Sequence, residues 1–361
     1  MTEHPLPSPA QLLQAPKVLL HDHLDGGLRA ETVIELADEF GYQGLPTNDP
    51  AELALWMRRG ADRKDLVLYL ETFAHTVGVM QTSAAIHRVA RECAEDLAAD
   101  GVVYAEVRFA PELHTEQGLS MDEVLEAVTS GFADGSAGTS LTIRTICSAM
   151  RHLDKSLEVS QLAVSWRDRG VVGFDIAGPE NGFPPDDHSL AFQYAQRENF
   201  HYTIHAGEAY GPPSIWKALQ WCSAERLGHG VRIVDDITIG DDGEAHLGRL
   251  AHYIRDRRIP LEVCPSSNLH TGVVDDLADH PIKLFKDLRF RVTLNTDNRL
   301  MSDVSMTSEM QNMVDVFGWN LADMQWLTVN AMKSAFLPFD ERLALINTVI
   351  KPTYAKLIAE S

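Results

Sequence analysis

The chain has 361 residues, of which 45% are hydrophobic and 23% charged, and its 52 acidic and 31 basic side chains give a formal net charge of −21. An acidic surface repels phosphate backbones and anionic headgroups, which argues against nucleic-acid and membrane partners but not against a small neutral substrate. The length allows two domains or one large α/β barrel.

No basic stretch followed by an apolar core begins the chain, and no apolar run is long enough to span a membrane. Four cysteines lie far apart in apolar stretches, as is typical of reduced thiols in a protein core: Cys93, Cys147, Cys222 and Cys264. We therefore expect a cytoplasmic protein.

Short apolar or β-branched runs recur along the chain, separated by longer helical patterns. From the second run onward they start about 25–40 residues apart, the length of one strand-plus-helix unit. Eight such units predict a closed (β/α)8 barrel of the TIM type, and no linker divides it, so we expect one domain over residues 1–361. The expected strands are 18–21, 102–109, 141–148, 171–176, 202–205, 226–227, 259–264 and 290–295.

The gap between the first two strands is much longer than the others and contains several helical patterns, over 29–40, 50–58, 64–79 and 83–99. We predict a helical insertion over about residues 29–100, placed at the barrel face that carries active sites. It forms either a lid or pocket wall, with Leu53, Leu55, Trp56, Leu70 and Phe73 as apolar candidates, or ordinary helical padding. Further helices are expected over 121–133, 157–169 and 247–257, and a loose Asp- and Gly-rich loop over 233–248.

Two histidines flank one aspartate, His21-Asp22-His23, at the end of the first expected strand. Side chains alternate faces along a strand, so His21 and His23 point the same way and form half of a transition-metal site. Alone the pattern is weak, because random placement of the 15 histidines gives roughly 0.6 such pairs.

Other polar residues follow the ends of later strands, and in a parallel barrel these ends meet at one mouth. His205 ends the fifth strand and Asp297 follows the eighth. Together with His21 and His23 they are candidate ligands for one Zn²⁺ ion, a set that leaves a coordination position for water.

Two more residues at the same mouth suit proton transfer. His229, between two glycines after the sixth strand, is available as a general base for a metal-activated water. Glu208, three residues past His205, could serve as a proton donor if burial raises its pKa. Both residues argue against a non-catalytic zinc scaffold. A binuclear hydrolase usually needs a carboxylated lysine near the fourth strand, and residues 171–179 contain no lysine.

At these residues the chain resembles the adenosine deaminase family, the zinc-dependent purine deaminases of the amidohydrolase superfamily. The matching segments run in family order over most of the chain: KVLLHDHLDG from residue 17, VYAEVRFAP from 103, DIAG from 175, HAGE from 205, LGHG from 227, CPSSN from 264 and LNTD from 294. The H-x-E and P-C-x-x-C patterns of the other zinc deaminases are absent.

The resemblance implies roles for these residues. His21, His23, His205 and Asp297 would bind zinc, and His229 would take a proton from the zinc-bound water as it attacks C6 of adenine. Glu208 would protonate N1, after which ammonia leaves. For the substrate, the resemblance implies that His23 lines its pocket, that the Gly178 amide meets purine N3 and that Asp25 binds the ribose 5′-hydroxyl. Asp175 would support the metal ligands from behind, or be a structural aspartate.

The chain departs from the family pattern at two positions. Asn298 replaces a second aspartate that donates to purine N7, and an amide can donate there at any pH. We therefore expect Asn298 to keep the N7 contact; the alternative is a reshaped loop with altered ring specificity. Pro179 replaces a residue that is often acidic, and its missing N–H changes the loop beside N3.

The substrates implied by this resemblance are adenosine and 2′-deoxyadenosine, which the enzyme would hydrolyse to inosine and 2′-deoxyinosine in purine salvage. Asp25 beside the ribose counts against AMP, because the two negative charges would repel. Adenine and aminodeoxyfutalosine remain alternatives, and Arg151 and His152 are further candidates for the pocket lining.

Overall fold

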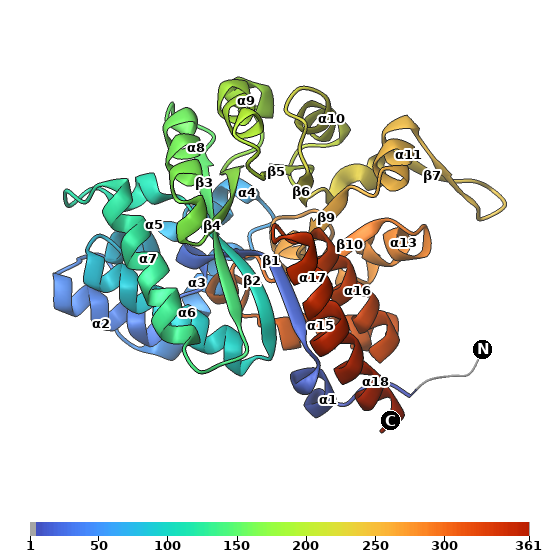
Figure 1. Cartoon of the computed structure of the whole chain (residues 1–361), viewed down its shortest axis with the longest axis horizontal. Coiled ribbons are helices and arrows are strands. Elements are labelled where there is room, and N and C mark those ends of the chain that lie inside the picture. Colours follow the sequence, from blue (N-terminus) through green and yellow to red (C-terminus); the bar gives the residue numbers. More distant parts are fainter. Residues whose placement is uncertain (1–4, 361) are drawn as a thin grey trace.

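The computed structural model describes residues 5–360 and has a barrel of parallel strands surrounded by helices (Figure 1). Within these residues the barrel consists of two four-stranded parallel sheets, in the orders β1-β2-β3-β4 and β10-β9-β6-β5. Each of the eight expected strands is present. The strands are β1 Lys17–His23, β2 Val102–Phe109, β3 Thr142–Met150, β4 Val171–Ala177, β5 Thr203–Ala206, β6 Arg226–His229, β9 Pro260–Val263 and β10 Arg291–Leu294.

Helices cover the outside of the barrel, with α2 to α6 on one side and α15 to α18 on another (Figure 1). The α-helices are α1 Pro9–Gln14, α2 Ala30–Phe40, α3 Pro50–Ala61, α4 Leu66–Leu70, α5 Phe73–Val79, α6 Ser83–Ala99, α7 Met121–Ser136, α8 Ser156–Ser165, α9 Ser189–Arg197, α10 Pro212–Gln220, α11 Arg249–Asp256, α12 Pro265–His270, α13 Ile282–Asp287, α14 Arg299–Ser302, α15 Met306–Phe317, α16 Leu321–Ser334, α17 Phe339–Leu345 and α18 Lys351–Ala359. Among the described residues, none of these helices combines the length and apolar character needed to cross a bilayer.

Among residues 5–360, only isolated bridges close the barrel between its two sheets. Asp22 pairs with Asp297 on one side, and Phe174 pairs with Tyr202 on the other. The register in which β1 pairs with β2 shifts between Leu19 and Asp22, just before the first of these bridges. The two seams are therefore held by fewer backbone contacts than the strands within each sheet.

Buried helix contacts depend on small residues and good caps. Helices α6 and α7 make close contact because Gly131 and Gly135 lack side chains; a Cβ at Gly135 would lie 2.1 Å from Arg91 O. Ser120 begins α7 with a capping box, in which its hydroxyl accepts from the Glu123 N–H. The four cysteines are buried and unpaired, as expected.

The structure corrects two expectations about loops and helices. Residues 233–248 are not a loose loop: the 3-10 helix Val231–Asp236 leads into an antiparallel hairpin of β7 Ile237–Ile239 and β8 Ala245–Leu247. Its turn is closed where the Asp242 carboxylate accepts the Glu244 N–H. The expected helix 64–79 is divided into α4 and α5, with residues 71 and 72 forming a turn between them.

One buried carboxyl group in α15 predicts a pH dependence of stability. Glu309 is fully buried, its Oε1 accepts the Ser266 N–H, and its Oε2 has no hydrogen-bond partner. Burial raises the pKa of Glu309 to about 7, above the ordinary value of 4.5. The folded state therefore binds more protons than the unfolded state between these values, and this group destabilises the fold as the pH rises through that window.

We predict that Glu309→Gln removes this penalty. Relative to the wild type, the free energy of unfolding of the variant should increase by up to about 3 kcal/mol between pH 5 and pH 8. Denaturant unfolding at several pH values measures this difference, with Glu39→Gln as an exposed control. Parallel stability curves for wild type and Glu309→Gln would contradict the prediction.

Candidate active site

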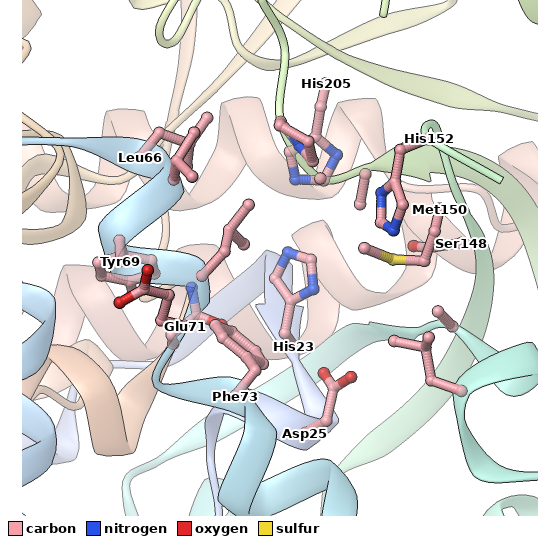
Figure 2. A pocket seen from close by; sticks show the side chains of 18 of the residues that line it. His23, Asp25, Leu66, Tyr69, Glu71, Phe73, Ser148, Met150, His152 and His205 are labelled. Carbon is pink, nitrogen blue, oxygen red and sulfur yellow. The ribbon is translucent and has the colours of Figure 1, made fainter. Parts of the chain in front are cut away.

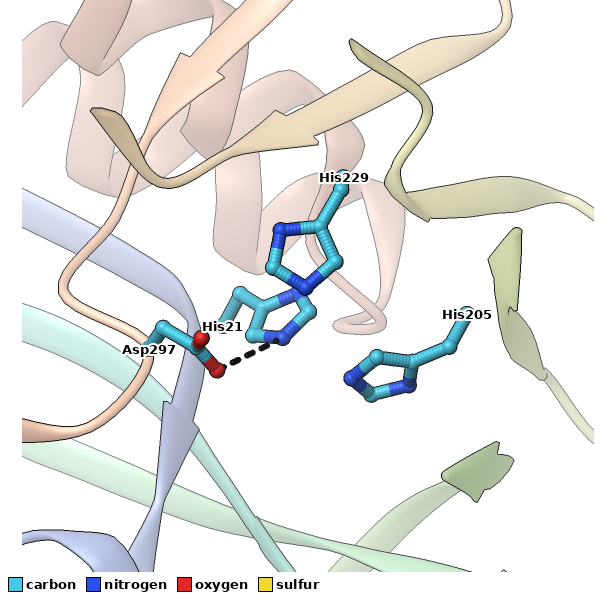
Figure 3. Close-up of side chains that lie close together, drawn as sticks. All are labelled: His21, His205, His229 and Asp297. Carbon is cyan, nitrogen blue, oxygen red and sulfur yellow. Dashed lines mark ion pairs between the residues drawn. The ribbon is translucent and has the colours of Figure 1, made fainter. Parts of the chain in front are cut away.

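Four of the side chains singled out by their strand-end positions meet at the barrel mouth (Figure 3). His21 comes from β1, His205 from β5 and His229 from β6, and Asp297 follows β10. One potential ligand atom from each lies within 4.8 Å of the others, and all four residues are buried. The carboxyl ends of these strands therefore do bring their polar residues together.

His23 lies beside this group. Its Nε2 is 3.3 Å from Asp297 Oδ1, the same oxygen that lies 3.3 Å from His21 Nε2. Its ring centre is 5.4 Å from that of His21 and 5.3 Å from that of His205. The tightest group of four thus contains His229 where the sequence-based ligand set contains His23, and both sets share the other three residues.

Backbone pairing at the barrel seam brings Asp297 to the histidines. The His23 N–H donates to Asp297 O at 2.7 Å, and the Asp297 N–H donates to His21 O at 2.9 Å. Asp297 and His229 each have a φ of 61°, in the left-handed region that side chains other than glycine rarely adopt. Two residues of the group are therefore held in costly backbone conformations, as is common at functional sites.

Buried carboxylates orient two of the imidazole rings. His21 Nδ1 lies 3.0 Å from Glu262 Oε2, and His205 Nδ1 lies 2.7 Å from Asp175 Oδ2. With Nδ1 occupied in this way, the Nε2 atom of each ring is left for the centre of the group. The Nε2 atom of His21 is buried and faces Asp297 Oδ1, 3.3 Å away (Figure 3).

Two buried arginines connect these carboxylates. Arg108 lies 3.0 Å from Asp175 and 2.8 Å from Glu262, and Arg226 lies 2.6 Å from Glu262. Burial opposes ionisation of Asp175, but His205 and Arg108 prevail and lower its pKa to about 2. Arg108 and Arg226 likewise hold the pKa of Glu262 well below its usual value against the effect of burial. Both carboxylates are therefore charged and fix the rings behind which they lie.

The donor atoms suit a zinc ion. Imidazole nitrogens and one carboxylate oxygen are the ligands that Zn²⁺ prefers, and here one such atom from each of four buried residues lies within 4.8 Å of the others. Burial lowers the pKa of His23, His205 and His229, which favours the neutral rings that metal binding requires. For His21, burial and Arg108 act in the same direction, but Asp297 and Glu262 prevail and raise its pKa. The residues present therefore fit the expected metal.

Glu208 lies beside the group with a raised pKa. It is buried, and its Oε2 lies 3.6 Å from His229 Nε2. Burial, followed by the carboxylates of Asp297 and Glu180, raises the pKa of Glu208 well above its usual value. A carboxyl group in this state keeps its proton near neutral pH and can donate it.

A second glutamate holds the loop that carries Glu208. The Glu180 carboxylate accepts four successive N–H groups, from Gly207 at 2.6 Å, Glu208 at 3.1 Å, Ala209 at 2.8 Å and Tyr210 at 2.8 Å. Glu180 directly follows Pro179, the position flagged for its altered loop. The carboxylate thus fixes the backbone of residues 207–210 from the adjacent strand end.

A chain of hydrogen bonds sets the protonation pattern of His229. The Ile282 N–H donates to His280 Nδ1, so the neutral His280 ring donates from Nε2 to Asn268 Oδ1 at 3.3 Å. Asn268 Nδ2 then lies 3.1 Å from His229 Nδ1 and donates to it. The neutral His229 ring therefore carries its proton on Nε2, the atom that faces Glu208.

A pocket of about 620 Å³ opens above this group (Figure 2). The predicted substrate residues His23, Asp25, Gly178 and Asn298 all line it, as does His152, whereas Arg151 instead donates to the backbone of Phe183 and His205. Burial raises the pKa of Asp25 to about 7. Among the described residues, no lysine or arginine lines the pocket.

The insertion forms one wall of this pocket. Helices α4 and α5 and their junction contribute Leu66, Tyr69, Leu70, Glu71 and Phe73, four of which are labelled in Figure 2. Of the apolar residues proposed for this wall, Leu70 and Phe73 line the pocket, whereas Leu53 is buried elsewhere and Leu55 and Trp56 are partly exposed outside it. The prediction was wrong for these last three residues because they lie on α3, the helix that precedes the pocket wall.

Three supporting residues were missed by the sequence analysis: Glu180, Glu262 and Asn268. Glu262 had a usable signal, because a carboxylate within the apolar run of β9 requires a charged partner in the core. Asn268 belongs to a quoted motif, but nothing in its neighbourhood along the chain indicates its contact with His229.

The chain matches the family model described as "Adenosine deaminase" over residues 16–352. It belongs to the adenosine deaminase family. Adenosine deaminase 1 of Streptomyces coelicolor is 62% identical over 359 residues, covering 98% of this chain and 91% of that protein. Adenosine deaminase of Mycobacteroides abscessus is 62% identical over 352 residues, covering 96% of this chain and 97% of that protein.

Solved structures agree with the adenosine deaminase assignment. An adenine deaminase from Arthrobacter aurescens superimposes with a TM-score of 0.84 at 25% identity, covering 96% of this chain and 99% of that one. An amidohydrolase from Burkholderia ambifaria with bound Zn also gives 0.84 at 25% identity, covering 100% and 97%. The predicted TIM barrel, the family and the hydrolase class are thereby confirmed.

The four hydrogen bonds that the Glu180 carboxylate accepts from residues 207–210 predict that Glu180 affects the deaminase reaction by positioning Glu208. Glu180→Gln replaces one acceptor oxygen with an amide group that faces N–H donors, so the Glu208 loop should lose its fixed position. Because Glu180 does not line the pocket, we expect kcat for adenosine to fall about tenfold while KM changes less than threefold. Steady-state kinetics measure this, with Glu92→Gln as a control for a buried glutamate that does not line the pocket. A loss confined to KM would contradict the positioning role.

Proposed function

We propose that this protein hydrolyses adenosine and 2′-deoxyadenosine to inosine and 2′-deoxyinosine, releasing ammonia, with one zinc ion per chain. The observation that carries the proposal is the meeting of four imidazoles, Asp297 and the protonatable Glu208 at the floor of a pocket without cationic side chains. Membership in the adenosine deaminase family and the names of the close relatives support the same reaction.

His21, His23, His205 and Asp297 would hold the zinc ion, with Asp175 and Glu262 behind them. A bound zinc ion lowers the pKa of a coordinated water and so supplies an oxygen nucleophile near neutral pH. The carboxylates behind His21 and His205 direct their Nε2 atoms inward, so these residues can bind without rearranging.

Glu208 and His229 would move the protons. Glu208 gives the proton on its carboxyl group to purine N1, which prepares C6 for addition. A neutral imidazole does not give up its single N–H proton to a carboxylate, so His229 would accept the nucleophile's proton at Nε2 in the other tautomer, with the ring proton on Nδ1 and the Asn268 amide turned so that its oxygen faces the ring. His229 would then take the nucleophile's proton, and Glu208, whose Oε2 is 3.6 Å away, would supply the proton for N1.

Pocket lining favours a nucleoside over a nucleotide. Asp25, which lines the pocket, would bind the ribose 5′-hydroxyl, and a 5′-phosphate would find no lysine or arginine among the described lining residues. Gly178 has a φ of 103°, and a Cβ there would lie 3.1 Å from Met150 Cε, so only glycine lets the backbone approach purine N3 freely. The volume of about 620 Å³ exceeds what adenine alone needs, which supports nucleosides over the free base.

An absorbance assay tests the reaction. Zinc-loaded enzyme should convert adenosine rapidly and act far more weakly on adenine and AMP. Glu208→Gln should lower kcat by about 10²- to 10⁴-fold, because it removes the proton donor. Glu71→Gln, which changes another carboxyl group lining the same pocket, should retain most of the activity.

Metal analysis of the same samples tests the zinc proposal, with one ion expected per chain in the wild type and in Glu208→Gln. Full activity of Glu208→Gln would refute the donor role. Zinc-loaded protein that converts none of the three compounds would refute adenosine as substrate and move the proposal to a modified adenine nucleoside such as aminodeoxyfutalosine.

Asn298 should recognise purine N7. It lines the pocket, and Gly26 leaves room for its amide, since a Cβ at that glycine would lie 2.0 Å from Asn298 Oδ1. Asn298→Ala should lower kcat/KM for adenosine about tenfold or more, but change it much less for 7-deazaadenosine, which lacks the acceptor. Equal losses on both substrates would show that Asn298 acts on the loop and not on N7.

A further inference from the structure

A second cavity lies at the opposite end of the barrel from the proposed active site. It has a volume of about 530 Å³ and is bordered by the amino-terminal ends of β6, β9 and β10 and by residues 333–337 and 342. The residues discussed above occupy the carboxyl ends of these strands, so the two cavities are separated by the barrel core. Nothing in the proposed deaminase reaction uses this second cavity.

Positive charge gathers around this cavity. Its lining includes five cationic side chains that form no ion pair with any described residue: Arg257, Arg258, Arg291, Lys333 and Arg342. Its single acidic lining residue, Glu225, already pairs with His201 at 2.7 Å. In a chain with a formal net charge of −21, cations this close together would ordinarily find carboxylate partners.

Two of these guanidinium groups each have a nitrogen atom that lacks a hydrogen-bond partner among the described residues. The Nε atoms of Arg291 and Arg342 are buried and have no hydrogen-bond partner in the part of the chain that the structure describes. Arg342 Nη1 donates to Lys333 O at 2.7 Å, and Arg258 Nη1 donates to Arg289 O, so both side chains are held in place by backbone carbonyls that leave their charge uncompensated. Burial, followed by Arg258 and Arg342, lowers the pKa of Arg291.

We infer that this cavity binds a small phosphate-bearing anion. Guanidinium groups present paired N–H donors that match phosphate oxygens, and several around one cavity can bind a group with two or more negative charges. The cavity is larger than a single phosphate needs, and Tyr253 lies at its edge with Arg257 5.2 Å above its ring. Inorganic phosphate and the phosphate groups of a nucleotide share this chemistry.

The cavity is connected to the proposed active site through the core. Arg226 lines its inner side and lies 2.6 Å from Glu262, which in turn lies 3.0 Å from His21 Nδ1. A bound anion would thus sit at the outer end of the charge network that orients a metal-site histidine.

Calorimetric titration of the zinc-loaded enzyme with inorganic phosphate, and separately with ADP, tests the inference. We expect one of the two to bind at a single site, and tighter binding of ADP would identify a nucleotide as the natural source. Arg257→Ala combined with Lys333→Ala should weaken this binding at least about tenfold, because two charge-assisted contacts are lost. Arg59→Ala combined with Lys351→Ala removes the same charge from exposed positions elsewhere and should change it less than twofold.

Three results would overturn the inference: no binding of either probe, binding that survives in the Arg257/Lys333 double variant, or an equal loss in the control pair. The second result would place the anion at the metal centre or elsewhere. If the double variant fails to fold, Lys333→Glu alone provides the test, since Lys333 is exposed and forms no ion pair among the described residues.

Discussion

The charge network in the barrel core, built from Arg108, Arg226, Asp175 and Glu262, fixes the geometry on which the active site depends. A buried carboxylate is costly unless it is paired, and each of these carboxylates lies between an arginine and the back of an imidazole ring. The network therefore combines two tasks that are usually separate: it neutralises charge in the core and it selects the nitrogen that each histidine offers. Removing one member would leave its partner charged and buried, a loss of about 3–5 kcal/mol that would accompany any catalytic defect.

The residues that form the site and the residues that hold them in place differ in how far they can be predicted from sequence. His21, His205, His229 and Asp297 are predictable because each lies at or just beyond the carboxyl end of a strand, and parallel strands present these ends at one mouth. Glu180, by contrast, acts through four backbone N–H groups that lie 27 to 30 residues away along the chain. Such a contact depends on the path of a loop, and no periodicity in the sequence records that path.

Local structure shows the same division. All eight barrel strands could be located because strand-plus-helix units repeat at similar spacing. The hairpin of β7 and β8 and the break between α4 and α5 could not, because the hairpin lies in an Asp- and Gly-rich stretch typical of a loop, and the break interrupts an otherwise helical pattern at residues 71 and 72. That break matters for function: it allows the short α4 and α5 to present Leu66, Leu70 and Phe73 to the pocket.

The seam closed by Asp22 and Asp297 has a mechanical consequence. His21 and His23 belong to the sheet that contains β1 to β4, whereas His205 and Asp297 belong to, or directly follow, strands of the other sheet. An ion held by all four would cross-link the two halves of the barrel at the point where only one backbone bridge joins them. Metal binding would then stabilise the whole fold, and the metal-free barrel would separate first at the seam between Asp22 and Asp297.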